Sequence, residues 1–575
     1  MDASMRAEMD AAAREFVNAP VSYTFTNREK RALAAICSNI DRKIFFLSGL
    51  PESVIATVLA MYSRLKNSRG LRGHIVDNLI PVLMFAGIRE GEGGAQHLDW
   101  RDLQKMFRTL SISGLDAVCN HSPAFDSLFE SFVSAAGDPE YWRHIATSKR
   151  IQDFKNEHLD RYGHNSIIRP ARLILCVEQV SILVAKIIER TWPGTAFIEL
   201  STRYVDFSGK SQYPIWNELG VFGEAYERRA KVTIEASVEA YRELIGANFD
   251  GPFPNEVREW ASSRVTDQKD LNAGVIGESC DVLGNLLPCA TLTELGLAVS
   301  GEAMGELLKH LRLENSPECV AVAQMIQDET VRAGHGYFLR HCDPTPWERS
   351  MPRYIETTEE LVFDLFDERR VMERLLLARD GRIYGGIDFA NKIEQEFERF
   401  ISSLQDVPRG EYDKLPELFR VASVMVQNAM SFRGWRDLQR QSLSVHARSR
   451  VTPLLGFYTY PKFQSEAFTR ACTSARARDA ECYASFVQAH VPAEISEYPL
   501  AMGNLVMYQM TSDLRQAEFC AWQRTKWGVN DEVRQRFLSL EHWLRTFYPW
   551  WARISRADMT PHYVFARGVN PVVLA

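Results

Sequence analysis

Serine and arginine side chains with regular spacing are the residues of this chain best suited to bind a phosphate group. In FIELSTRYVDF (197–207), alternation places Glu199, Ser201 and Arg203 on one face of an extended segment. Arginine forks and hydroxyl groups suit the geometry of a phosphate dianion better than a lysine does. Ser201 and Arg203 are the pair that we expect to hold such a dianion.

A second group of arginines lies in SFRGWRDLQRQSLSVHARSR. Arg433, Arg436 and Arg440 follow one another at spacings of three and four, so they share one face of a helix. They either line a binding pocket or form an exposed stripe paired with Asp437, which would contribute little to stability. His446, further along, is expected at the surface rather than in a catalytic role.

Structural explanations compete with the phosphate-binding interpretation. Ser201 and Arg203 could form the solvated face of an edge strand, which is a common place for alternating polar residues. Arg515 stands between Asp513 and Glu518 on an expected helix, so local ion pairing is its alternative role. The order of the surrounding motifs favours a binding site in both cases.

These residues must be positioned by helices and extended segments that occur twice along the chain. Helical periodicity predicts one buried helix over 170–190, followed by the extended segment 197–207. A second block has a mostly apolar helix over 416–430, directly before the arginine-rich helix. Each block is followed by a further helical stretch, one from Leu287 and the other from Tyr498. The pattern predicts a diverged tandem repeat.

The order of these blocks divides the chain into three parts. Residues 1–342 form an N-terminal repeat with a helical leader, 343–410 a connecting region rich in proline and charge, and 411–575 a diverged C-terminal repeat. A chain of 575 residues is too long for one ordinary core, which agrees with two copies of one domain.

The composition is that of an ordinary globular protein. Hydrophobic residues make up 46%, charged residues 25%, and the net charge of -7 does not demand a nucleic-acid polymer as partner. The N-terminus is charged, and the most apolar stretch, 173–188, is interrupted by Glu178 and Lys186. We therefore expect a cytoplasmic protein with no membrane partner. The ten cysteines stand singly, which predicts reduced, mostly buried thiols and no metal site.

Three motifs in succession resemble those of the flavin-dependent thymidylate synthase superfamily: GHNS (163–166), VEQVS (177–181) and IELSTRYVDF (198–207). The signature of that family is Arg-His-Arg, seven residues, and then Ser-x-Arg-Tyr. Ser201, Arg203 and Tyr204 match its second half. The positions of the first half are occupied by Thr191-Trp192-Pro193, so this copy departs from the family there.

The second block resembles the same superfamily in a different part of the signature. RDLQRQS is similar to the RDLQRHR of long, duplicated members. Arg436 and Arg440 match, whereas Gln441 and Ser442 replace the histidine and the last arginine.

A downstream helix of the family carries an arginine that holds the nucleotide. TSDLRQAEFCAWQR places Arg515 at that position, with Glu518 and Arg524 at matching offsets. The first copy has Glu302 instead, and Arg169 stands where the family usually has a glutamate. The two copies thus depart from the family in complementary ways.

The resemblance implies an α/β (α+β) fold of tandem domains, each a central sheet with flanking helices and a helical subdomain, helix-rich overall. It implies FAD as cofactor and a reaction that transfers a methylene group from methylenetetrahydrofolate to deoxyuridylate (dUMP) and reduces it with a hydride from NADPH. No protein nucleophile is required, because the flavin carries the bond changes while the protein orients and polarises the pyrimidine.

The resemblance also implies the residues of the site. The substrate would be held by Glu199, Ser201, Arg203, Tyr204, Arg515 and Arg524, with Arg515 as the catalytic residue. The cofactor would be held by His164, Ser166, Arg436, Gln439 and Arg440. Each pocket would be a composite of two unlike copies, and two chains would reproduce the four-domain assembly of the family, so we expect a homodimer.

The missing Arg-His-Arg element leaves alternatives to a thymidylate synthase-like methyltransferase. One is a flavin-dependent alkylation of a different pyrimidine nucleotide, with Glu302, Arg169 and Arg420 as altered pocket residues. The other is a non-catalytic homologue that binds a nucleotide and has lost the flavin. His164 would then be an ordinary turn histidine before a helix.

Overall fold

The computed structural model of the protein describes residues 3–48, 67–81, 172–189, 195–336, 341–350, 375–377, 387–403, 413–441, 443–463, 465–565 and 570–574, with a few further residues within 114–134, at 339 and at 409–410. The chain forms two compact units. Unit 1 comprises residues 1–201, 210–221 and 291–351, and unit 2 comprises residues 202–209, 222–290 and 352–575. Residues 222–290 thus belong to the same unit as the C-terminal part of the chain.

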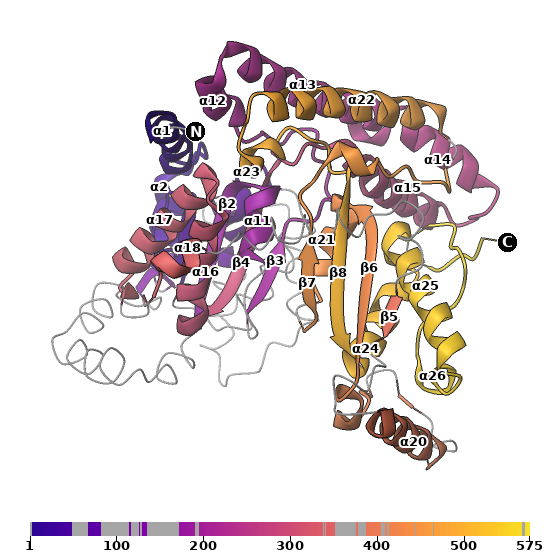
Figure 1. Ribbon diagram of the computed structural model, residues 1–575. Helices are drawn as coiled ribbons and strands as arrows, with labels where there is room; N and C mark the ends of the chain where they lie inside the picture. Colours follow the sequence, from indigo (N-terminus) through magenta and orange to yellow (C-terminus); the bar gives the residue numbers. More distant parts are fainter. Residues whose placement is uncertain are drawn as a thin grey trace, which may run out of the picture. The chain divides into compact units, whose positions relative to one another are not determined.

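Unit 1 contains a four-stranded antiparallel sheet in the order β1-β2-β4-β3, and Figure 1 labels its strands β2, β4 and β3. Its strands are β1 (Ile44–Leu47), β2 (Arg172–Ser181), β3 (Ala196–Glu199) and β4 (Leu292–Ser300). Its helices are α1 (Ala3–Asn18), α2 (Asn27–Ile36), α4 (Gly70–His74), the π-helix η1 (Ile75–Leu79), α11 (Ile182–Ile188), α12 (Ile215–Leu219), α16 (Gly301–Glu314), α17 (Pro317–Arg332) and α18 (Pro346–Ser350).

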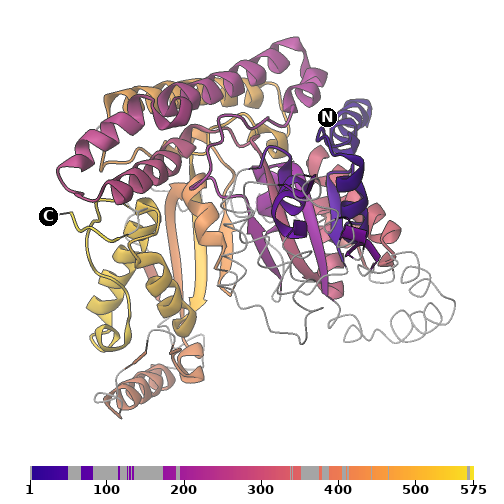
Figure 2. The same cartoon turned by 180° about the vertical axis from the view of Figure 1, so that it is seen from behind.

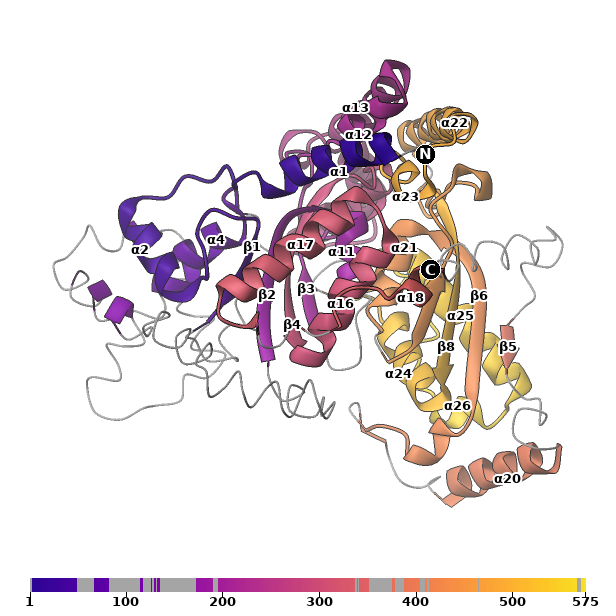
Figure 3. The same cartoon turned by 60° about the vertical axis from the view of Figure 1, so that its left-hand side comes forward.

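The core of unit 1 lies between this sheet and the helices α11, α16 and α17, which Figure 3 shows against it. Alternate residues of the two central strands point into this core, among them Leu175 of β2 and Leu297 of β4. Leu307 and Leu311 of α16 cover them at helical spacing. All four side chains are fully buried, so the sheet presents a rigid base for the loops at its ends.

Unit 2 contains a second antiparallel sheet, in the order β5-β6-β8-β7. Its strands are β5 (Leu375–Leu377), β6 (Ser423–Ser431), β7 (Val445–Arg448) and β8 (Leu505–Asp513). Its longer helices are α13 (Glu224–Ile245), α14 (Pro252–Ser262), α15 (Gln268–Leu283), α20 (Ile387–Ser403), α21 (Phe432–Gln439), α22 (Glu466–Gln488), α24 (Leu514–Thr525) and α25 (Asp531–Phe547). Short turns of helix are η5 (Ala247–Phe249), η6 (Gly284–Leu286), η8 (Glu417–Arg420), η9 (Pro453–Leu455), α23 (Ala493–Ser496) and α26 (Trp551–Ile554), and η4 (Gly220–Phe222) lies at the boundary of the units.

A helical subdomain accompanies the second sheet. The long helices α13 and α22 run side by side in both Figure 1 and Figure 2, and α14 and α15 pack against them. Helices α24 and α25 pack against one another beside the sheet. The predicted fold class, a helix-rich α/β protein of tandem domains with a central sheet each, is therefore confirmed.

The two sheets share their strand order and also the way in which their central strand ends. Ser181 ends β2 and caps α11, and both its backbone N–H (2.8 Å) and its hydroxyl (2.6 Å) donate to Glu318 at the start of α17. Ser431 ends β6 and caps α21, and it donates through the same two groups to Glu532 at the start of α25. This repeated serine and glutamate pair is the structural mark of the internal duplication.

Replacing Ser431 by alanine removes a helix cap and one buried hydrogen bond to Glu532. We expect the free energy of unfolding to fall by about 1–3 kcal/mol, measured by urea denaturation. Ser181→Ala should give a loss of similar size, because the contacts are the same in the first repeat. Unchanged stability in both variants would contradict a shared role for this pair.

Several segments predicted as helices begin as strands. Residues 172–181 of the predicted helix 170–190 form β2, and residues 423–430 of the predicted helix 416–430 belong to β6. The stretches from Leu287 and Tyr498 likewise contain β4 and β8 ahead of α16 and α24. Central strands that are buried along most of their length lose the alternation of apolar and polar residues, and a helix that follows without a loop then extends the apolar run.

Two further expectations concern extended segments. The predicted extended segment 197–207 is a strand only at its start, because β3 ends at Glu199 and turns follow. The region 343–410, predicted to be a connection, contributes β5, which pairs with β6 at the edge of the second sheet. Nine of the ten cysteines lie in the described part of the chain, and these nine are buried and free, as predicted. Within the same part, no helix is both long and apolar enough to span a membrane.

Asp479 of α22 links this helix to the turn before β8. It accepts hydrogen bonds from the backbone N–H of Ala501 (3.0 Å) and from Asn504 (2.6 Å). Burial raises the pKa of Asp479 to about 6, from 3.8, and outweighs these hydrogen bonds, which lower it. The folded protein therefore takes up this proton at a higher pH than the unfolded chain does.

This difference makes stability depend on pH in a defined direction. As pH falls from about 7 to about 4, the contribution of Asp479 to the free energy of unfolding should rise by on the order of 2–3 kcal/mol. Asp479→Asn should remove that contribution. Urea midpoints of wild type and variant, measured near pH 7 and near pH 5, give the difference, and parallel pH profiles would contradict the prediction.

Candidate functional site

The arginine-bearing helix α21 is buried in unit 2. Arg433 and Arg436 are each 4% exposed, so the alternative of an exposed arginine stripe is wrong for these two residues. Arg433 donates to Asp281 (3.0 Å) and to the backbone carbonyls of Thr202 and Cys280. Burial would lower the pKa of Arg433, but the Asp281 carboxylate reverses this effect and raises it. Arg433 therefore remains charged and links α21 to α15 through its ion pair with Asp281.

Arg436 lies one helical turn further along α21, beside a second pair of arginines. Its guanidinium is 3.5 Å from the sulfur of Met502. The guanidinium of Arg448, at the end of β7, lies 5.2 Å from the ring of Trp435. Arg436 and Arg448 both act electrostatically on the buried thiol of Cys289, so the two guanidinium groups belong to one neighbourhood.

Glu497 joins Arg448 to Arg450. Its two carboxylate oxygens lie 3.1 Å from Arg448 and 2.8 Å from Arg450, and one of them also accepts from the backbone N–H of Val451 (2.8 Å). Burial alone would raise the pKa of Glu497, but the two arginines hold it below its usual range. We call Arg436, Arg448, Arg450 and Glu497 the basic cluster. It combines three buried guanidinium groups with one carboxylate, an arrangement suited to a bound anion.

The corresponding positions of the first repeat keep one cation but surround it with carboxylates. Lys186 stands five residues after Ser181, as Arg436 stands five after Ser431. Its ammonium contacts Glu189 and lies 2.7 Å from Glu199, and all three side chains are buried. One ammonium between two carboxylates repels an anion instead of binding it.

The strand registers show which residues correspond. Glu199 of β3 is paired with Leu295 of β4, and Arg448 of β7 is paired with Tyr508 of β8. Leu295 lies five residues before Ser300, which ends β4, and Tyr508 lies five residues before Asp513, which ends β8. Glu199, predicted to bind the substrate, thus corresponds to Arg448, and in the first repeat it belongs to an internal ion cluster.

Arg203 packs on helix α21 of unit 2. Its guanidinium lies 2.6 Å from the carboxylate of Asp437, and both side chains are largely buried. Ser201 is buried in unit 1, and Tyr204 is 40% exposed. The predicted common face of Glu199, Ser201 and Arg203 is wrong, because the strand ends at Glu199 and the following turn directs Arg203 to α21.

Arg515, the predicted catalytic residue, is the second residue of α24. Its guanidinium contacts Glu417 of η8, and the Asp513 carboxylate is held by Arg420 (3.3 Å). Glu518 pairs with Arg409 and Arg556, so the alternative of local pairing between Arg515 and its sequence neighbours is wrong, and Arg515 contacts Glu417 instead. Glu302 occupies the same second position of α16, as the sequence comparison indicated.

Arg524 lies at the end of α21, because Gln441 accepts from its guanidinium at 2.8 and 3.0 Å when the amide oxygen faces it. Gln439, predicted to bind the cofactor, is buried, and Arg440 is half-buried. His446 is half-buried, and its ring contacts the carbonyl of Gln441 (3.0 Å). Arg524 is thereby brought next to the predicted cofactor residues.

The structure adds two arginines to the candidate site that the sequence interpretation omitted, and two of the predicted cofactor residues lie outside the part that it describes. Arg448 and Arg450 were missed, although their alternate spacing is the pattern that singled out Ser201 and Arg203 in the first block. The predicted cofactor residues His164 and Ser166 lie outside the described residues, as does Arg169.

Comparison with known proteins agrees with the motif analysis. Residues 120–333 match the family described as thymidylate synthase complementing protein. A UPF0159 protein of Chlamydia muridarum is 24% identical, with 75% of this chain and 77% of that protein covered. A UPF0159 protein of Thermoplasma acidophilum is 22% identical, with 76% and 96% covered, and one of Chlamydia pneumoniae is 24% identical, with 65% and 60% covered. Across residues 120–333 the chain is therefore similar to the thymidylate synthase complementing protein family, as its motifs indicated.

Proposed function

We propose that this protein is an FAD-dependent, thymidylate synthase-like enzyme that methylates a pyrimidine nucleotide, dUMP or a close analogue. Methylenetetrahydrofolate would supply the carbon and NADPH the hydride. The basic cluster is the observation that carries the proposal, because two of its three buried guanidinium groups share a single carboxylate and the third, on Arg436, lies in the same neighbourhood. Such a site favours a phosphate-bearing molecule over a neutral one.

The residues around the basic cluster fit a phosphate-bearing ligand. Arg436 and Gln439 lie on α21, and Arg448 and Arg450 lie on or just after β7, so donors from two elements converge. FAD, when bound, supplies the redox chemistry of the family. The part of the protein is to hold phosphate oxygens with these donors and to keep the pyrimidine oriented near Arg524.

The charges of the two repeats indicate that the ligand binds to unit 2 and not to unit 1. Lys186 in unit 1 is already surrounded by Glu189 and Glu199, so the matching position there is closed to an anion. We propose that the protein is cytoplasmic and forms a homodimer, in which the unlike repeats of two chains complete the pockets. Light scattering of the purified protein tests the dimer.

Absorbance spectroscopy of the purified protein tests the proposed reaction class. FAD is added first, and dUMP is then titrated in. A flavin band that shifts with dUMP is the expected result, followed by turnover with methylenetetrahydrofolate and NADPH. Absence of flavin binding under all conditions would overturn the flavoenzyme proposal.

A second candidate is a nucleotide-binding homologue without catalysis. It is favoured by the contact of the predicted catalytic residue Arg515, which is held by Glu417. In that case dUMP would bind without any flavin. Binding of both, with product formed only from another pyrimidine nucleotide, would instead identify the altered-substrate enzyme.

A further inference from the structure

The indole N–H of Trp435 is a buried hydrogen-bond donor that has no acceptor among the described residues. Trp435 lies on α21, directly before Arg436 of the basic cluster, and it is 3% exposed. An indole N–H can only donate, so its missing partner must be an acceptor. Burying such a group without a partner costs free energy, and folded proteins rarely leave one in this state.

Packing holds the indole ring in one orientation. The rings of Trp435 and Phe432 lie nearly parallel, with centroids 6.1 Å apart and an angle of 16° between their planes. The guanidinium of Arg448 lies 5.2 Å from the ring of Trp435 and 4.9 Å from that of Phe432. One face of the indole is thus covered by a cation. The N–H lies at the edge of the ring, where this contact does not occupy it.

The basic cluster around this ring has more donors than acceptors. Its three guanidinium groups can only donate. Glu497 is the one carboxylate of the cluster. Its oxygens already accept from Arg448 (3.1 Å), Arg450 (2.8 Å) and the backbone N–H of Val451 (2.8 Å). A ligand that binds here must therefore bring acceptor oxygens, which is also what the N–H of Trp435 lacks.

An unpaired indole N–H does not by itself identify a binding residue. Trp550 also has a buried N–H without an acceptor in the described part of the chain, in an aromatic cluster with Phe397 (5.5 Å) and Phe419 (6.2 Å). Trp435 differs from Trp550 because Arg448 of the basic cluster lies against its ring. The unpaired donor and its position beside the basic cluster together point to a ligand.

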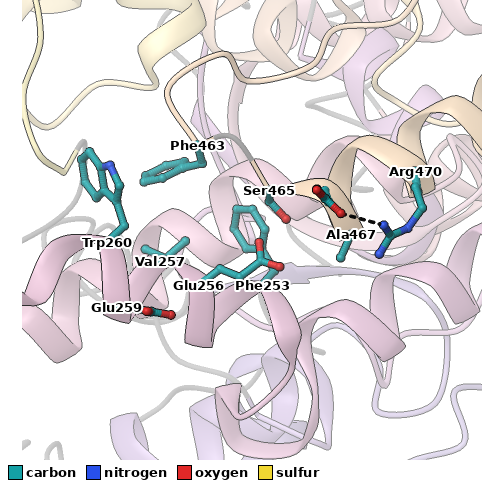
Figure 4. Close-up of a pocket in the computed structure, with 10 residues that line it drawn as sticks. Phe253, Glu256, Val257, Glu259, Trp260, Phe463, Ser465, Ala467 and Arg470 are labelled. Atoms are coloured by element: carbon teal, nitrogen blue, oxygen red, sulfur yellow. Dashed lines mark hydrogen bonds and ion pairs between the residues drawn. The ribbon is translucent and has the colours of Figure 1, made fainter.

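A cavity of about 530 Å³ between α14 and the start of α22 is an unsuitable place for an anionic ligand (Figure 4). Three glutamates and one arginine line it, which leaves an excess of two negative charges. The arginine, Arg470, is already paired with Glu466 (3.2 Å), and Figure 4 shows this pair. An anion would be repelled there, so we expect it at the basic cluster.

We infer that the indole N–H of Trp435 donates a hydrogen bond to a phosphate oxygen of the ligand held at the basic cluster. The inference rests on the proposed function, in which a phosphate-bearing molecule binds there. The guanidinium groups supply the charge, and the neutral N–H fixes the position of one phosphate oxygen relative to Arg448. dUMP and FAD both carry phosphate, so the chemistry of the contact is the same for either ligand.

Calorimetric titration of dUMP and of FAD into the full chain tests this role with Trp435→Phe, which keeps an aromatic ring and removes the N–H. We expect W435F to weaken binding by about tenfold, because hydrogen bonds to charged groups are among the stronger ones in proteins. Trp550→Phe is the matched control, since it removes an N–H that is also buried and unpaired among the described residues. Its affinity should equal that of the wild type. A loss confined to dUMP or to FAD identifies the phosphate that the indole contacts.

Shifts in melting temperature separate binding from stability. Both exchanges remove volume from a packed site and so change the stability of the ligand-free protein. Saturating ligand should raise the melting temperature of W550F as much as that of the wild type, and that of W435F by less. Circular dichroism establishes that the variants fold.

The outcomes distinguish this inference from the proposed function. Unchanged affinity in W435F, together with weaker binding in R448Q, would overturn the role of the indole and leave the proposed function in place. Equal losses in W435F and W550F would also overturn it, because the effect would then be structural. Failure of the wild type to bind either dUMP or FAD would refute the proposed function itself.

Discussion

Replacing Lys186 by methionine is expected to lower the free energy of unfolding by about 3–5 kcal/mol, because Glu189 and Glu199 would lose the cation between them. The Lys186 side chain is 1% exposed, and those of the two glutamates are fully buried. Methionine fills a similar volume, so the loss reports the missing charge and not a cavity. Denaturation by urea, followed by circular dichroism, measures the change.

Neutral partners provide the control for this variant. The triple variant K186M/E189Q/E199Q removes all three buried charges at once. We expect it to regain most of the stability that K186M loses. Arg436→Met, at the matching position of the second repeat, should cost less stability, since Gln439 and Arg448 replace the two glutamates there. Equal losses for K186M and the triple variant would show that the ion cluster is not the cause.

The duplication could be predicted from the sequence because it depends on the order of local patterns. Two apolar runs, each followed by a polar motif and a second apolar stretch, were sufficient to indicate two copies. The identity of the elements was harder to predict. β2 leads directly into α11 through Ser181, so an apolar strand and an apolar helix form one continuous run with no loop residues between them.

Capping residues would have divided these runs correctly. Ser181, Ser300, Ser431 and Asp513 each accept a hydrogen bond from the backbone in the first turn of the helix that follows a strand. A serine or aspartate inside an apolar run is a signal for such a boundary. Counting from Ser181 and Ser431 also aligns Arg190 with Arg440, one residue earlier than the motif spacing suggested.

The sequence predicted the chemistry of the site but not which residues contact one another in it. An arginine-rich anion site was expected, and buried arginines are present on α21. Their partners, however, come from segments distant in sequence, such as Glu497 for Arg448 and Asp437 for Arg203. Sequence spacing carries no information on such contacts. Only the strand registers show that Glu199 of the first repeat and Arg448 of the second occupy equivalent positions.

Glu497→Gln is expected to tighten nucleotide binding at the basic cluster by about tenfold, while it lowers stability in the absence of ligand. Glu497 is ionised at pH 7, because Arg448 and Arg450 hold its pKa below the usual range. The glutamine keeps an oxygen that can accept from the N–H of Val451 but no longer neutralises the two guanidinium groups. These groups then gain more from a phosphate than they do in the wild type.

Arg448→Gln should act in the opposite direction and weaken nucleotide binding by about 10–100-fold, since hydrogen bonds to charged groups contribute about 1.5–3 kcal/mol. Calorimetric titration of dUMP and of FAD into each variant measures both effects. Added ligand should also restore the thermal stability of E497Q, because binding to the folded state stabilises it. Weaker binding in E497Q as well as in R448Q would mean that Glu497 only supports the fold, and the anion would then have to be held elsewhere. Tighter binding in E497Q and weaker binding in R448Q would instead locate the anion at this ion pair, whose charged groups lie 3.1 Å apart. A general loss of structure could not give this result, because it would weaken binding in both variants.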